Sequence, residues 1–144
     1  MLNAGYSGTP LWKKLGLKPG SRLCVVGAPK GYIEELVACA EVGTGERVRV
    51  ARRLPAPASA PVDLVQIFAT NEATFRRQLA AALAMLADGG AIWASWPKKS
   101  SGVDTQVDEN VIRAAALPLG LVDNKVCAVD QTWSGLRLAR RRTR

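Results

Sequence analysis

Histidine is absent from this chain of 144 residues. Histidine is the commonest general base near neutral pH and the commonest nitrogen ligand of metals in proteins. Its absence excludes every Ser-His and Cys-His nucleophile pair and argues against a histidine-bound metal centre. We therefore predict no catalytic residue and no metal site.

Cysteine is scarce as well. Cys24, Cys39 and Cys127 are odd in number, lie far apart and stand among Val, Leu and Ala. This pattern matches neither a disulfide framework nor a metal-binding knuckle. We expect three reduced, mostly buried thiols that pack as small hydrophobic groups.

Long apolar runs are missing too. No run approaches the roughly 18 residues that a membrane span needs, and residues 1–4 lack the basic and then apolar pattern of a signal peptide. We therefore expect a cytoplasmic protein without membrane contact. The length predicts one α/β domain over residues 1–140.

Acidic residues are absent from the last eight positions, where much of the formal net charge of +8 is concentrated. Without the five arginines in these last eight positions, the rest of the chain carries a net charge of about +3, which is ordinary for a soluble domain. Two interpretations stay open: residues 141–144 form a solvated basic tail, or the arginines bind nucleic acid weakly and without sequence preference. The arginines concerned are Arg140, Arg141, Arg142 and Arg144, preceded by Arg137.

The clearest pattern that is present spans residues 62–97. A near-continuous apolar run at 62–69 is followed by Asn71 as a helix cap, by apolar residues at helical spacing, and by the Gly-Gly pair at 89–90. A second apolar run then ends at Pro97. This order predicts a parallel strand-helix-strand unit in which the glycine pair ends the helix.

The rest of the chain continues this alternation. We predict strands at 22–27 and 47–50, a helix at 31–38, and a proline-rich connector at 55–61. A first helix begins with Thr9 as its cap, and a later one is capped by Asp104 or Thr105 and ends near 118–120. Two final strands, 122–129 and 136–140, are joined by a loop so short that they must be antiparallel.

From Val62 onward, this succession of strand, helix, Gly-Gly turn, strand, helix and closing hairpin resembles the second half of an S-adenosylmethionine-dependent methyltransferase. The resemblance implies a single reduced Rossmann-like sheet, mostly parallel with a C-terminal antiparallel hairpin and with helices on both faces. The implied strand order is 2-1-4-5-7-6 in the methyltransferase convention, without the usual third strand.

Four segments carry a second, more specific resemblance: residues 5–11, 95–99, 126–130 and 133–136. They are similar to a bacterial family catalogued as domain of unknown function number 3052. This resemblance covers nearly the whole chain. It implies no particular activity.

The cofactor positions of a methyltransferase are poorly matched. In the first turn, residues 27–31, Pro29 removes an amide donor, and the second strand ends at Arg52 and Arg53 where such enzymes use an acid for the ribose hydroxyls. We therefore predict no cofactor and disfavour S-adenosylmethionine. The predicted function is a noncatalytic binding or regulatory module, and the alternative is a minimal methyltransferase acting on nucleic acid or protein.

In an open parallel sheet, function lies where the strands end. The predicted loops at that edge gather lysines, hydroxyls and tryptophan, which together suit an anionic small molecule or a protein partner. Three alternatives stay open: the lysine pair is simply solvated, Trp93 and Trp96 belong to the core, and the tryptophan in the last hairpin is a lid on the sheet. The predicted site consists of Lys30, Gly31, Lys98, Lys99, Ser100, Trp133 and Ser134.

Overall fold

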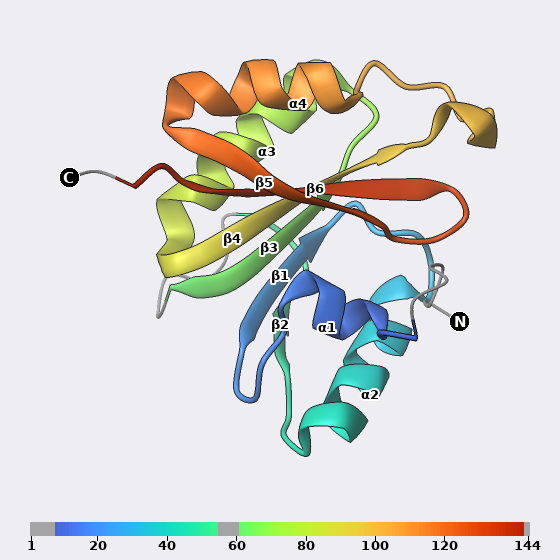
Figure 1. The fold of residues 1–144 in the computed structure, drawn as a ribbon, viewed down its shortest axis with the longest axis vertical. Helices are drawn as coiled ribbons and strands as arrows, with labels where there is room; N and C mark the ends of the chain where they lie inside the picture. The colour runs from blue at the N-terminus through green and yellow to red at the C-terminus, as the bar shows by residue number, and fades with distance from the viewer. Residues whose placement is uncertain (1–7, 55–60, 143–144) are drawn as a thin grey trace.

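The computed structural model describes residues 8–54 and 61–142, and these form a six-stranded sheet with helices on both faces (Figure 1). The sheet order is β2-β1-β3-β4-β6-β5. The strands are β1 (Arg22–Val26), β2 (Arg49–Ala51), β3 (Val62–Phe68), β4 (Leu86–Pro97), β5 (Leu121–Ala128) and β6 (Trp133–Arg140). The helices are α1 (Leu11–Leu15), α2 (Tyr32–Thr44), α3 (Glu72–Met85) and α4 (Glu109–Ala116), with short 3-10 turns η1 (Lys99–Ser101) and η2 (Leu117–Leu119).

The sheet confirms the predicted fold class. Strands β2, β1, β3 and β4 are parallel to one another, whereas β6 is antiparallel to both β4 and β5. The order equals the methyltransferase order with its third strand missing. The predicted connector at 55–60 lies outside the described residues.

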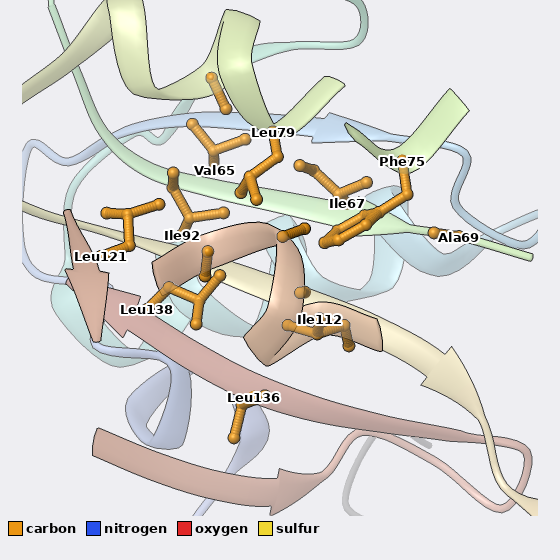
Figure 2. Packing of buried hydrophobic residues seen from close by; sticks show 14 of the residues in the cluster. Val65, Ile67, Ala69, Phe75, Leu79, Ile92, Ile112, Leu121, Leu136 and Leu138 are labelled. Carbon is orange, nitrogen blue, oxygen red and sulfur yellow. The ribbon is translucent and has the colours of Figure 1, made fainter. Parts of the chain in front are cut away.

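Two apolar layers hold the sheet between its helices. Helices α3 and α4 cover one face and α1 and α2 cover the other (Figure 1). Figure 2 shows the first layer, in which Phe75 and Leu79 of α3 and Ile112 of α4 pack on sheet residues such as Ile67 and Ile92. Burial of such side chains is the main favourable contribution to folding, about 1.5–3 kcal/mol for each large aliphatic group.

The second layer is centred on Trp93, which is fully buried. Its indole Nε1 donates a hydrogen bond of 2.8 Å to the carbonyl oxygen of Leu15 at the end of α1. One side chain therefore both fills the core and ties the short first helix to the sheet. Trp96 is 8% exposed, so both strand tryptophans belong to the core, as one of the open interpretations proposed.

Some predicted boundaries are wrong. The Gly-Gly pair at 89–90 does not end α3, because Leu86 already adopts an extended conformation and starts β4 opposite Val62. Helix α2 continues six residues past the predicted end at 38, to Thr44. Asp108, rather than Asp104 or Thr105, caps α4: its Oδ1 accepts the amide of Val111.

The N-terminal cap and the final hairpin differ as well. Pro10 occupies the cap position of α1, and no side chain caps that helix, so the expected role of Thr9 is wrong. The last hairpin is tighter than predicted, because Asp130 Oδ1 accepts the amides of both Thr132 and Trp133 and closes the turn early. Residues 133–135 therefore begin β6 instead of forming a loop.

The cysteines are more varied than predicted. All three are free thiols, but only Cys24 is buried; Cys127 is half-buried, and Cys39 is exposed on α2. Burial raises the pKa of Cys24 to about 11, which makes it an unreactive thiol at neutral pH. None of the helices in the described residues has the length and apolar character needed to cross a bilayer.

Candidate functional site

The parallel strands β1 to β4 all end on one side of the sheet, which we call the carboxyl edge; they start at the opposite amino edge. Lys30 follows β1, and Lys98 follows β4. Trp133 starts the antiparallel β6 and lies opposite Pro97, so it reaches the same edge (Figure 1). The topology therefore brings the segments that carry the predicted site residues to one edge.

The turn between β1 and α2 packs tightly on β3. Gly27 has a φ of +74°, and a Cβ at this position would lie 2.6 Å from the carbonyl oxygen of Phe68. Gly31, also at positive φ, is the cap of α2, and the amide of Tyr32 is bonded to the carbonyl oxygen of Pro29. The protein's own backbone thus occupies the space beside the first glycine.

Three aromatic side chains link this turn to the last hairpin. The rings of Tyr32 and Phe68 meet edge to face with centroids 4.8 Å apart, and Phe68 meets Trp133 in the same way at 5.0 Å. Such pairs add about 0.5–1.5 kcal/mol beyond their burial. Trp133 is half-buried against the second apolar layer, which fits the alternative that it is a lid on the sheet.

A buried polar chain runs beneath these rings. The Tyr32 hydroxyl donates to Gln66 Oε1 at 2.6 Å, and Gln66 Nε2 donates to Ser95 Oγ at 3.3 Å. Burial raises the pKa of Tyr32 above its ordinary value, so the phenol stays protonated and acts as a donor. This chain satisfies buried polar groups and does not supply a base at the edge.

The end of β2 carries an exposed ion pair. Arg52 Nη2 lies 3.0 Å from Glu34 Oε2 in the first turn of α2. The pKa of Glu34 is lowered because its carboxylate accepts a hydrogen bond from its own backbone amide and another from Arg52. The partial positive charge at the start of α2 therefore already has a carboxylate of the same chain beside it.

Lys98 is partly committed to the fold. Its Nζ donates to the carbonyl oxygen of Asp130 at 2.9 Å, and its amide donates to the carbonyl oxygen of Thr132 at 2.8 Å. Lys98 therefore fastens the end of β4 to the final turn. Lys99 and Ser100 are exposed on η1, and Ser134 is half-buried in β6 opposite Trp96.

A cleft of about 630 Å³ lies between the end of β4 and the start of α4. We call it the loop cleft. Its walls carry Lys98, Lys99 and Arg113, and equally three carboxylates, Asp104, Asp108 and Glu109. The loop cleft is therefore balanced in charge, which is less favourable to an anion than the sequence predicted.

Two of the seven predicted site residues, Lys98 and Lys99, line the loop cleft. The other five do not: Lys30, Gly31, Ser100, Trp133 and Ser134. The predicted site residues therefore lie at one edge but do not line one cavity. Two carboxylates of the cleft are engaged within the fold: Asp108 caps α4, and Glu109 pairs with Arg113 at 2.8 Å.

The last strand ends at Arg140, as predicted, and this arginine is bonded to the fold. Its guanidinium donates to the carbonyl oxygens of Leu83, Leu86 and Ala87. The amide of Arg141, in the predicted tail, donates to the carbonyl oxygen of Gly120 at 2.8 Å. Arg144 lies outside the described residues.

The strand order and the loops of the carboxyl edge define the class of protein: an α/β protein with the methyltransferase fold. A putative methyltransferase from Thermoplasma acidophilum superposes with a TM-score of 0.61 at 11% identity, covering 88% of this chain and 70% of that one. For magnesium protoporphyrin IX methyltransferase of Synechocystis with bound SAH, the TM-score is 0.61, the identity 11%, and the coverage 85% and 74%. For the N-methyltransferase NodS of Bradyrhizobium japonicum, the values are 0.56, 14%, 91% and 93%.

The chain belongs to the family described as "Protein of unknown function (DUF3052)", whose profile matches residues 58–142. This confirms the predicted family over residues 58–142; the match does not extend to the segment 5–11, so it covers less of the chain than predicted. A comparison with curated proteins gave no significant match. At these identities the structural neighbours establish the fold and leave the activity open.

The residues at the cofactor positions do not fit S-adenosylmethionine. The first turn contains Pro29, which has no amide to donate to a cofactor, and Gly27 in that turn packs against the Phe68 carbonyl. At the end of β2, the position of the ribose-binding acid holds Arg52, which has no acceptor and is paired with Glu34.

Proposed function

We propose that this protein is a noncatalytic binding module that keeps the methyltransferase fold without its cofactor site. The observation that carries the proposal is that neither cofactor position keeps its usual binding groups. Pro29 supplies no amide in the first turn, where Gly27 packs against the Phe68 carbonyl, and Arg52 stands in place of the acid and is paired with Glu34. A cofactor would therefore lack backbone donors at one position and the acceptor at the other.

The alternative is a minimal methyltransferase acting on nucleic acid or protein. The fold supports it, since two structural neighbours, magnesium protoporphyrin IX methyltransferase and DhpI, are complexes with SAH. The chemistry at the edge argues against it. The best-placed phenol, Tyr32, is buried with a raised pKa, and the carboxylates of the loop cleft are engaged by Arg113 and by a helix amide, apart from Asp104.

We expect isothermal titration with S-adenosylmethionine, and separately with S-adenosylhomocysteine, to show no binding tighter than about 100 µM. Each hydrogen bond that the missing cradle and acid would have supplied is worth about 1 kcal/mol net, and an unpaired buried group costs more. A methyltransferase of known affinity serves as the positive control. A dissociation constant in the low micromolar range would overturn the noncatalytic assignment.

We further propose that the ligand of this module is anionic and docks at the carboxyl edge beside Lys99. Lys98 is already bonded to the hairpin, whereas Lys99 and Lys30 are exposed and make no ion pair in the described part of the chain. Trp96 lies in the wall of the loop cleft and provides a fluorescence signal for binding.

With inorganic pyrophosphate as the probe, Lys99→Glu should weaken binding by about tenfold at low salt and make the remaining binding less sensitive to salt, because an attractive charge beside the ligand is reversed. Lys13→Glu, an exposed lysine on α1, makes the same change in net charge away from the cleft. The measurement is a tryptophan fluorescence titration. Equal weakening by both variants would show that only the overall charge matters.

A further inference from the structure

A second cleft, of about 650 Å³, opens at the amino edge, on the other side of the molecule from the loops discussed above. It lies between the start of β4, with its Gly-Gly pair at 89–90, and the end of β6. In Figure 1 this is the side where the C-terminus emerges. We call it the arginine cleft, because Arg137, Arg140, Arg141 and Arg142 line it.

The cleft exists because two neighbouring strands part. The ladder between β4 and β6 ends at the pair Ile92 and Leu138. Beyond this pair, residues 86–91 and 139–142 run on without pairing to each other, and Arg140 bridges the gap by its three bonds to the α3–β4 carbonyls. The cleft is thus part of the folded sheet and not a property of a loose tail.

The charge of the arginine cleft is unbalanced. None of the described residues that line it carries a carboxylate. Arg140 is bonded only to neutral carbonyls, and Arg137 donates to Asn124 Oδ1 at 3.2 Å. Four guanidinium charges therefore meet in one cavity, while the carboxylates of Asp63 and Asp88 line an adjoining cavity that Arg137 also borders. Arginines gathered in this way repel one another less when an anion is bound.

The chemistry of the walls narrows the kind of anion. Guanidinium groups match the geometry of phosphate oxygens and hold them through paired hydrogen bonds. The described lining contains no aromatic side chain on which an unpaired base or a nucleoside ring could stack. Contacts with the phosphates of a stacked, paired strand need no such platform and carry no sequence information.

We infer that the arginine cleft binds the phosphate backbone of a nucleic-acid duplex, without sequence preference. The footprint is short. Beyond the Gly-Gly pair, the adjoining small cavity holds Asp63 and Asp88, which interrupt the positive surface before Arg22 and Arg49 at the far side of the edge. About three to four phosphates are therefore contacted, and the affinity is moderate and strongly dependent on salt.

The test is the salt dependence of binding of a labelled DNA duplex of about 20 base pairs, measured by fluorescence anisotropy. For the wild-type chain we expect the logarithm of the affinity to fall with the logarithm of salt at a slope of about −3 to −4, or about 100-fold between 50 and 200 mM. The double variant Arg141→Ala, Arg142→Ala should reduce the size of the slope by about 2, and Arg137→Gln should reduce it by about 1.

Arg52→Ala with Arg53→Ala is the matched control, since it removes two adjacent arginines at the opposite edge. It should leave the slope unchanged, and thermal unfolding should confirm that every variant is folded. Equal effects of the control pair and the cleft pair would overturn the inference. An unchanged slope in Arg137→Gln would also overturn the inference. In that case Arg141 and Arg142 would be binding alone, as an unstructured tail and not as part of the cleft.

A further comparison distinguishes the class of polyanion. A polyglutamate peptide carries dense negative charge without phosphate geometry, and we expect it to compete with the duplex at least tenfold less well per charge. Equal competition would indicate that the partner of the cleft is an acidic protein and not a nucleic acid. These measurements involve no cofactor, so their failure and the failure of the proposed noncatalytic function are separate outcomes.

Discussion

Replacing Trp93 by alanine is expected to lower the free energy of unfolding by about 3–5 kcal/mol, the largest single effect that we predict. The indole is fully buried between the sheet and α1, so its removal leaves a large cavity. It also leaves the carbonyl oxygen of Leu15 without its hydrogen bond of 2.8 Å. For a domain with about 5–15 kcal/mol of total stability, this is a severe loss.

Urea denaturation followed by circular dichroism measures this effect, and Trp93→Phe separates its two causes. Phenylalanine keeps most of the buried volume but cannot donate to Leu15, so it should cost about 1–3 kcal/mol. A loss below about 1 kcal/mol for Trp93→Ala would mean that the layer can collapse around the site. It would then follow that α1 is not fixed by this contact.

Replacing Gly27 by alanine should cost about 2–4 kcal/mol, the second largest effect. Two terms add: the positive φ of 74° is strained for any residue with a Cβ, at about 1–2 kcal/mol, and the new atom would lie 2.6 Å from the Phe68 carbonyl oxygen. A backbone oxygen cannot turn aside as a flexible side chain would. One of the two strand ends must therefore move.

Gly31→Ala is the matched control, because Gly31 has a φ of +83° but nothing within 4 Å of the position of a Cβ. Its cost should be limited to backbone strain, about 1–2 kcal/mol. Thermal or urea unfolding of both variants gives the comparison. Equal losses at the two positions would refute the close approach between Gly27 and Phe68 and would reopen that space to a ligand.

The elements that the sequence predicts well are those whose signal is local. The unit from 62 to 97 follows from apolar runs, and the cap at Asn71 is confirmed by its side chain accepting the amide of Thr74. The antiparallel direction of β5 and β6 follows from the shortness of their connection. In each case the residues that decide the structure are neighbours along the chain.

The errors arise where distant residues decide. Nothing near Leu86 in sequence shows that it will leave α3 early to pair with Val62. Arg140 reads as part of a basic run, and only the packed end of α3 reveals the carbonyls that bind it. The arginine cleft could not be predicted for the same reason, because it depends on where the ladder of β4 and β6 ends.

The candidate site shows the same division. Topology alone brings Lys30, Lys98 and Trp133 to one edge, and the sequence supports that much. It does not show that Lys98 is bonded to the hairpin, or that three carboxylates face the lysine pair across the loop cleft. Those facts depend on side-chain geometry at the turn and reduce the net charge that a ligand would meet.

The sheet order has a consequence for synthesis on the ribosome. Strand β6 is made after β5 yet lies between β5 and β4, so β5 has no place in the sheet until β6 has emerged. Until then, a nascent chain can assemble only β2, β1, β3 and β4, leaving the buried side of β4 as an open, apolar edge. That interval exposes the chain to aggregation. The fold is thus completed late, when the β5–β6 hairpin adds to the edge of β4 as a unit.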